Sequence, residues 1–140
     1  MVAFKFRLEK VLHVREIQEE RAKMGWATEE RLAREERLKL VNLKNQEQAI
    51  KDFGYAQSHI ELRQAMYSFL ELLKQRIERQ ELRVGEQELV ANRAKEAWLV
   101  ARQETKKITT LREQQYADFV KEEQRKEQKL LDDMRSHVTN

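Results

Sequence analysis

The sequence predicts an all-α fold, a long antiparallel two-helix coiled-coil hairpin that forms a single domain. Three observations predict it. The 140 residues include no proline and only three glycines, and Ala, Glu, Lys, Leu and Arg supply over half of the chain, which is the composition of a coiled coil or long helix. Apolar residues recur every three or four positions along two long segments. One short break separates these segments, and a short loop between long helices makes an αα-hairpin.

The break lies at residues 52–58, which read Asp-Phe-Gly-Tyr-Ala-Gln-Ser. Gly54 is placed to adopt the left-handed conformation that commonly follows a helix end. Ser58 and Glu61 have the spacing of a capping box, which opens a new helix. We therefore predict helix one over about residues 5–53, a turn over 54–58, and helix two over about 59–137.

The two helices should meet along a seam of residues at alternating steps of three and four. Helix two has the cleaner apolar pattern, whereas helix one carries charged residues at several seam positions, which lower the stability of the pairing. The predicted seam residues are Trp26 from helix one and Leu70, Leu73, Ile77, Val84 and Trp98 from helix two.

Two glycines inside the predicted helices suggest how the seam is packed. If the turn centres on Ala56, Gly25 and Gly85 lie level with each other, beside Trp26. Glycine inside a helix costs about 1 kcal/mol relative to alanine. The missing side chain of Gly85 could make room for the Trp26 indole, so we count Gly85 with the seam. The alternative is that both glycines are simply tolerated.

Helix two is longer than helix one, so its C-terminal part should extend beyond the hairpin. This overhang is expected to begin near Lys106 and to span roughly thirty residues at 1.5 Å per residue. It carries Ile108, Tyr116 and Phe119. An isolated helix gains little stability unless it packs an apolar face, so the overhang should either fray or bind a partner through these residues.

Four aromatic residues lie close to the predicted turn: Phe53, Tyr55, Tyr67 and Phe69. The tip of a hairpin has too little interior to bury four rings. Exposed aromatic clusters often mark binding surfaces, so these rings are candidate partner-binding residues. The alternative is that they pack on one another and close the end of the hairpin.

The sequence offers no constellation for catalysis and none for a metal or cofactor. His13, His59 and His137 are isolated, and the scattered glycines form no phosphate-binding loop. A two-helix fold also lacks the deep pocket in which catalytic groups are desolvated. The net charge is only +3 with mixed signs, which argues against a nucleic-acid partner. With no signal peptide and no long apolar run, we expect a cytoplasmic, non-enzymatic protein without cofactors.

Residues 4–16 read Phe-Lys-Phe-Arg-Leu-Glu-Lys-Val-Leu-His-Val-Arg-Glu. This stretch resembles the opening of FliJ-family proteins, the small components of the flagellar type III export apparatus. The family often begins with Phe-basic-Phe, then Leu-Glu, a Val-Leu or Leu-Leu pair and an Arg-Glu step. The chain is also similar to the family in its length, in its single turn, and in having Trp98 shortly before the charged stretch Gln-Glu-Thr-Lys-Lys at 103–107.

The resemblance implies a monomeric, non-catalytic stalk shaped like the coiled coil of a rotary ATPase γ subunit. Such a stalk would enter the pore of the hexameric export ATPase FliI, stimulate it, and contact the export gate protein FlhA and export chaperones. It would act peripherally at the inner membrane. The alternatives are the stalk of a virulence-type type III secretion system, a generic structural coiled-coil adaptor, and a basic nucleic-acid-binding hairpin.

Overall fold

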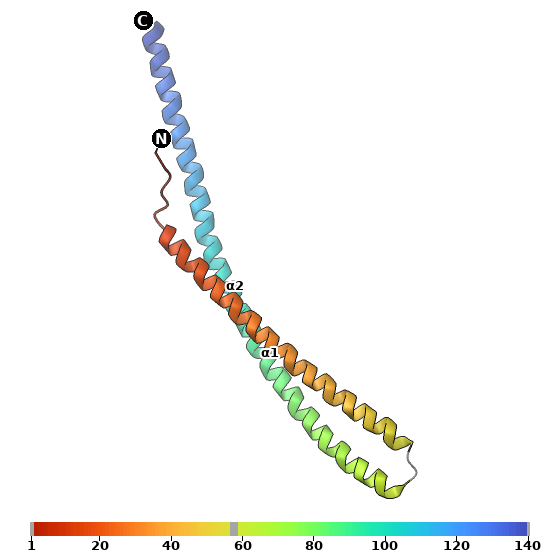
Figure 1. Cartoon of the computed structure of the whole chain (residues 1–140). Coiled ribbons are helices and arrows are strands. Elements are labelled where there is room, and N and C mark those ends of the chain that lie inside the picture. Colours follow the sequence, from red (N-terminus) through yellow and green to blue (C-terminus); the bar gives the residue numbers. More distant parts are fainter. Residues whose placement is uncertain (1, 57–58, 140) are drawn as a thin grey trace. The chain divides into compact units, whose positions relative to one another are not determined.

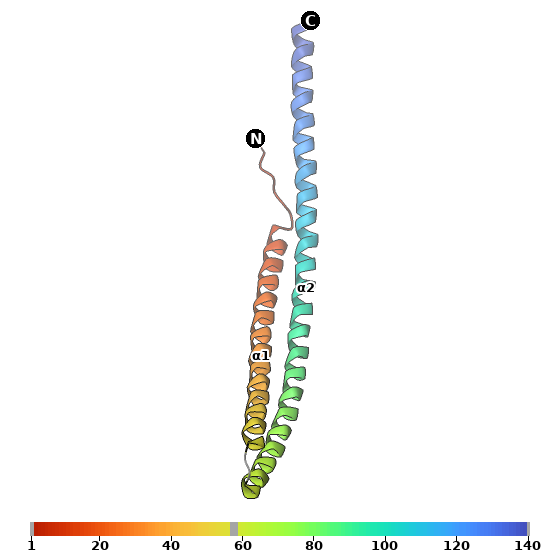
Figure 2. The ribbon, with the colours of Figure 1, turned by 90° about the vertical axis from the view of Figure 1, so that its right-hand side faces the viewer.

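A computed structural model describes residues 2–56 and 59–139 of the chain, and these residues form two helices. Helix α1 spans Glu9–Tyr55 (47 residues) and helix α2 spans Ile60–Thr139 (80 residues). The helices run antiparallel (Figures 1 and 2), and no strand occurs in the described ranges. The predicted all-α hairpin is thereby confirmed.

The chain divides into two compact units, each built from both helices. The first, Arg21–Trp98, contains the hairpin tip, and we call it the tip unit. The second combines Met1–Glu20 with Leu99–Asn140, and we call it the terminal unit. Each unit buries apolar side chains of its own.

The core of the tip unit is formed by side chains of both helices. Leu73 and Ala33 are completely buried, at 0% exposure each. Leu70, Trp26 and Trp98 are half-buried. The remaining buried apolar side chains of this unit are Ile77, Val84 and Ala91. Burial of these side chains from both helices supplies the main force that holds α1 against α2.

The two tryptophans meet face to face across the seam. The ring centroids of Trp26 and Trp98 lie 5.1 Å apart, and the ring planes differ by 21°. The Lys95 ammonium lies 5.8 Å from the centre of the Trp26 ring, within the range of a cation–π contact. The stack aligns α1 and α2 at this level.

Two glutamine side chains also form hydrogen bonds across the seam of the tip unit. The Gln80 side-chain amide donates to the Glu36 main-chain carbonyl at 2.9 Å, and Gln87 donates to the carbonyl of Glu29 at 3.2 Å. Each glutamine also donates to the carboxylate of the same glutamate. Gln80 is 5% exposed, and a buried amide needs such partners. These hydrogen bonds fix which residues of the two helices face each other.

The expected role of Gly85 is wrong. Gly85 is exposed, and a Cβ atom added there would meet no other atom within 4 Å. The same holds for a Cβ at Gly25. Trp26 packs on Trp98 instead, because the facing residues of α2 lie further along the chain than a turn centred on Ala56 would place them.

The expected left-handed conformation of Gly54 is also wrong. Helix α1 continues through Gly54 to Tyr55, and none of the described glycines has a positive φ. Gly54 is buried, and a Cβ there would overlap the Met66 side chain of α2. Its lack of a side chain therefore permits close approach of the two helices. The predicted capping box depends on Ser58, which lies outside the described residues.

Residues 2–8 of the terminal unit are not helical. Helix α1 starts at Glu9 and not near residue 5, where the sequence predicted its start. In this segment Phe6 is only 7% exposed, and Leu12 in the first turns of α1 is 6% exposed. Thr105 of α2 is also buried, and its hydroxyl donates to the main-chain carbonyl of Arg15 at 3.2 Å. Apolar burial and this polar contact hold the start of α1 against α2.

Candidate protein-binding surfaces

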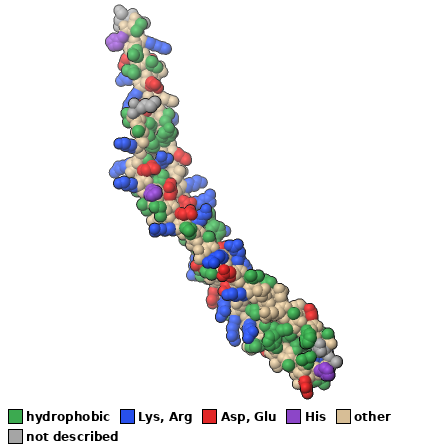
Figure 3. Space-filling view, in the orientation of Figure 1, with side chains coloured by type: hydrophobic (Ala, Val, Ile, Leu, Met, Phe, Trp, Pro, Cys, Tyr) green, Lys and Arg blue, Asp and Glu red, His purple; other side chains and the backbone are tan. Residues whose placement is uncertain are grey.

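The four aromatic residues predicted near the turn form an exposed surface on the tip unit. Their exposed fractions range from 43% for Phe69 to 71% for Tyr55. Ring contacts among the described residues join other aromatic side chains, and none joins these four to one another. Figure 3 shows hydrophobic side chains gathered near the hairpin tip. We define the tip surface as Phe53, Tyr55, Ile60, Leu62, Tyr67, Phe69 and Leu72, all of them exposed.

A small apolar cavity opens between the two helices at this surface. It has a volume of about 180 Å³ and lies beside Gly54. Its walls include Ile50 and Phe53 from α1 and Met66 and Phe69 from α2. Apolar pockets of this kind accept the anchoring side chain of a protein partner. The glycine contributes directly, because a larger residue would compete with Met66 for the same space.

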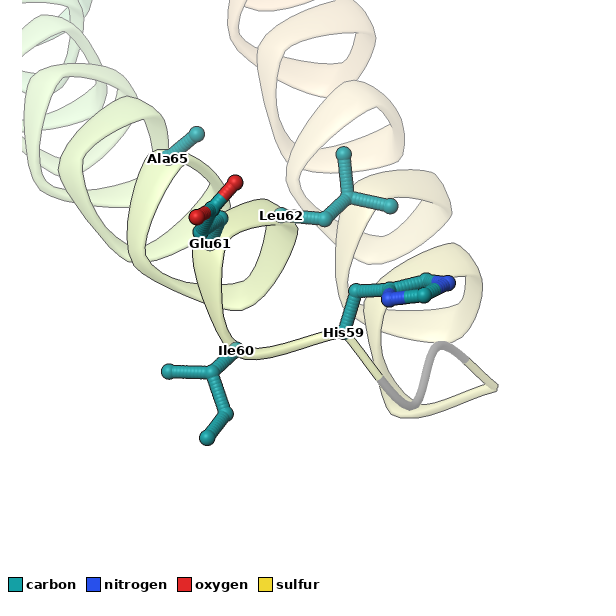
Figure 4. Close-up of a pocket in the computed structure, with 5 residues that line it drawn as sticks. All are labelled: His59, Ile60, Glu61, Leu62 and Ala65. Carbon is teal, nitrogen blue, oxygen red and sulfur yellow. The ribbon is translucent and has the colours of Figure 1, made fainter.

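The first turn of α2 adds a second hollow to the tip surface, lined by His59, Ile60, Glu61, Leu62 and Ala65. Figure 4 shows Leu62 directed toward α1, whereas Ile60 points away from both helices. Ile60 is 72% exposed. Aliphatic side chains at this exposure extend the apolar surface beyond the aromatic rings that the sequence indicated.

In the terminal unit, the non-helical residues 2–8 lie along α2, and we call this segment the N-terminal strap. The Phe4 ring packs edge-on against Tyr116 with centroids 5.3 Å apart, and it lies 5.5 Å from the Phe119 ring. Where the strap joins α1, Glu9 pairs with Arg112 at 3.1 Å. Two of the three residues predicted in the overhang, Tyr116 and Phe119, therefore have partners within the chain.

The expected start of the overhang near Lys106 is accordingly wrong. Thr105, Arg112 and Phe119 all contact residues at the start of the chain, and Ile108 is half-buried. The reason is that the strap runs past the start of α1 and covers more of α2 than a helix of equal length would cover, since an extended residue spans about twice the rise of a helical one. Figure 1 shows α2 continuing beyond the strap.

A groove of about 550 Å³ continues along α2 from the strap. It runs from Val2 and Phe119 past Val120 to Leu130. Further along, Leu131, Met134 and Val138 are at least half exposed. This final stretch of α2 presents an apolar face that no described residue covers, so it is a second candidate binding surface.

Sequence reasoning missed the strap and the aliphatic part of the tip surface. The strap had a signal, because residues 4–8 alternate apolar and basic residues with a period of two, which is typical of extended chain. Ile60, Leu62 and Leu72 lie off the seam in a segment of helical periodicity. Scattered surface aliphatics carry no signal by themselves.

The described residues contain no cluster of three or more His, Cys, Asp or Glu side chains that could hold a metal ion. Neither helix has, in its described part, an apolar stretch long enough to cross a membrane.

The structure superposes on the solved structure of a protein described as a YscO homolog, CT670 from Chlamydia trachomatis, with a TM-score of 0.56 and 21% identity, covering 97% of this chain and 95% of that one. At this identity the likeness concerns the fold alone. No curated protein sequence matches the chain. The model of the flagellar FliJ protein family matches residues 4–139. Since this match covers both helices and most of the strap, the chain belongs to the flagellar FliJ protein family.

Proposed function

We propose that this protein is a non-catalytic stalk of the flagellar protein export apparatus. In this role it binds the hexameric export ATPase FliI in its central pore and stimulates it, and it contacts the export gate protein FlhA and export chaperones. The observation that carries the proposal is the family match over residues 4–139, which includes both helices of the hairpin.

The two exposed surfaces would allow such a stalk to bind two partners at different places. The terminal unit, with the strap and the part of α2 beyond Lys121, faces the ATPase ring. The tip surface contacts the export gate through its exposed rings. This assignment is supported by the apolar character of both surfaces, because exposed apolar patches of this kind mark protein–protein contacts.

The charged faces of both helices suit a contact that must form and release repeatedly. Most ion pairs are exposed, as in Arg31 with Glu35 and Arg125 with Glu122. Exposed pairs contribute only about 0–1 kcal/mol each. A stalk with this surface binds a ring mainly through a few apolar anchors, which keeps the complex reversible.

The proposal is tested by measuring ATP hydrolysis by the export ATPase of the same organism with and without this chain, together with the size of the ATPase in solution. We expect faster turnover and a shift to hexamers. If the chain is folded and helical, and neither turnover nor size changes, the ATPase role is wrong.

Two variants separate the surfaces. A chain that ends at Lys121 keeps Phe4 on Tyr116 and Phe119 but lacks the last part of α2, and it should lose most of the stimulation. The tip variant Tyr55→Ser with Tyr67→Ser should stimulate the ATPase normally and bind the purified cytoplasmic part of the export gate more weakly. Loss of stimulation in the tip variant would contradict the assignment of the two surfaces.

A virulence-type export stalk and a generic structural coiled coil are the competing functions. The matching family is the flagellar one, which favours the flagellar role over the virulence role. Deletion of the gene distinguishes all three, because only a flagellar stalk should be needed for motility and for secretion of flagellar subunits.

A further inference from the structure

Three arginines form a basic stripe on α2 within the tip unit. Arg76, Arg79 and Arg83 are spaced by three and four residues and therefore share one face of the helix. All three side chains are exposed. Together with Leu43 of α1 and the buried Gln80 they line a groove of about 210 Å³ between the two helices.

The stripe is set apart by its position, because its three arginines line one groove. Other cations of the tip unit that have no ion pair among the described residues, such as Arg34, Lys74 and Arg93, do not line that groove. Elsewhere in the unit, Arg37 pairs with Glu30 and Glu88. By contrast, none of the ion pairs among the described residues involves an arginine of the stripe. Their guanidinium groups are therefore available to carboxylates from outside the chain.

The carboxylate of Glu36 lies beside the stripe, but it is already engaged. It accepts a hydrogen bond from Gln80 and pairs with Lys39 at 3.2 Å. These two hydrogen bonds are the main reason that the pKa of Glu36 lies below its ordinary value, and the positive charge of Arg83 contributes less. With Lys39 beside it, Glu36 leaves a surplus of positive charge along the stripe.

The chemistry of the groove selects the kind of partner. Guanidinium groups bind carboxylates with two parallel hydrogen bonds, and acidic residues three and four apart on a helix have the same spacing as the arginines. Leu43 at the groove provides an apolar contact between them. An amphipathic helix with carboxylates beside a leucine matches both features.

We propose that Arg76, Arg79 and Arg83 dock an acidic amphipathic helix of a partner protein, with an apolar side chain of that helix on Leu43. A nucleic acid fits the stripe less well. The stripe is roughly 10 Å long, whereas phosphate backbones are bound through many contacts along a longer track. Glu78 and Glu81 also lie between the arginines in the sequence.

The probe is a capped, alanine-based helical peptide of 21 residues with Glu at three positions spaced i, i+3 and i+7 and one Leu on the same face. It is titrated into the ¹⁵N-labelled full chain at low salt, and the arginine Nε–H resonances are followed by NMR. We expect the signals of Arg76, Arg79 and Arg83 to shift together and the shifts to shrink as salt is added. Shifts spread evenly over the arginines of the chain would overturn the proposal.

Charge reversal gives the decisive comparison. The triple variant Arg76→Glu, Arg79→Glu and Arg83→Glu should bind the peptide about tenfold more weakly, as expected for three exposed ion pairs. It should bind a second peptide with Lys in place of Glu better than the acidic one. The matched control reverses Arg34, Lys74 and Arg93, which are exposed cations outside the stripe, and should keep its affinity within about twofold.

Three outcomes would contradict the proposal: equal losses in the two triple variants, no recovery with the Lys peptide, or tighter binding of duplex DNA or of phosphatidylglycerol vesicles than of the acidic peptide. Circular dichroism of each variant shows whether the hairpin is intact. If the stripe variant unfolds, Arg79→Gln alone serves in its place and should weaken peptide binding about threefold.

Discussion

At the scale of single residues, the three glycines lie inside helices but in different surroundings. A Cβ at Gly25 or Gly85 meets open space, whereas a Cβ at Gly54 overlaps the Met66 side chain. Glycine thus has a packing role at Gly54 only. The other two positions reduce helix stability without a compensating contact among the described residues.

The variant Gly85→Ala should therefore raise the free energy of unfolding by about 0.5–1 kcal/mol, because alanine restricts the unfolded chain and favours the helix. Urea titration followed by circular dichroism measures the change. Gly54→Ala is the control, and it should gain less because Met66 must move. An unchanged or lower stability of Gly85→Ala would show that the glycine has a role in the fold.

The carboxylate of Glu36 makes the stability of the tip unit depend on pH. The hydrogen bond from Gln80, followed by that from Lys39, lowers the pKa of Glu36 in the folded chain. Such a group stabilises the fold above its unfolded pKa, and this contribution is lost as the pH falls through the folded pKa. Wild type should thus lose more stability than Glu36→Gln on acidification from about pH 5 to pH 3. Thermal melting over this range is the measurement, and parallel curves would contradict the expectation.

At the scale of elements, the Trp26–Trp98 stack ties α1 to α2 in the tip unit. Trp98→Ala should lower the free energy of unfolding by about 2–4 kcal/mol, somewhat less than for a fully buried tryptophan because the ring is half-buried. Trp98→Phe should recover part of the loss. Chemical denaturation tests both, and a change below about 0.5 kcal/mol would show that the stack contributes little to stability.

The N-terminal strap is held mainly by its two phenylalanines. Phe4→Ala removes the contacts with Tyr116 and Phe119, and it should release the outer part of the strap at a cost of about 1–2 kcal/mol. The strap contains Lys5 and Arg7, so tryptic cleavage there should become faster. The exposed Val2→Ala serves as the control. Equal cleavage rates in wild type and Phe4→Ala would show that the ring does not hold the strap.

At the scale of the whole molecule, ion pairs within α2 stabilise its last part. Beyond Lys121, such pairs join Arg125 with Glu122 and Lys126 with Glu123. Short-range pairs of this kind stabilise a helix only slightly. We therefore expect residues 122–139 to be the least stable part of the helix.

Truncation after Lys121 should leave the melting temperature within about 2 °C of that of wild type, because surface changes of this kind usually alter stability by less than 0.5 kcal/mol. The helical signal should fall in proportion to the residues removed. A larger drop in the melting temperature would show that the free end of α2 packs on another part of the chain or on a second copy.

The fold class could be predicted from the sequence because heptad periodicity, absent proline and one break all act locally. Which residues of α1 lie opposite which residues of α2 could not be predicted. It depends on where α1 ends, and the helical conformation of Gly54 moved that end. The tip rings were found because aromatic side chains are conspicuous in a charged chain. The arginine stripe was not, since its distinguishing property is the groove that it lines together with Leu43 of α1, which only the arrangement of both helices reveals.

The stacked indoles give the chain an intrinsic optical reporter. Trp26 and Trp98 are its only tryptophans, and two indoles at 5.1 Å should couple their electronic transitions and quench each other's emission. The ultraviolet spectrum of the unlabelled protein therefore monitors one level of the helix pair. Any partner that separates α1 from α2 there should change the near-ultraviolet dichroism and the emission intensity, so helix opening can be followed in real time without a dye.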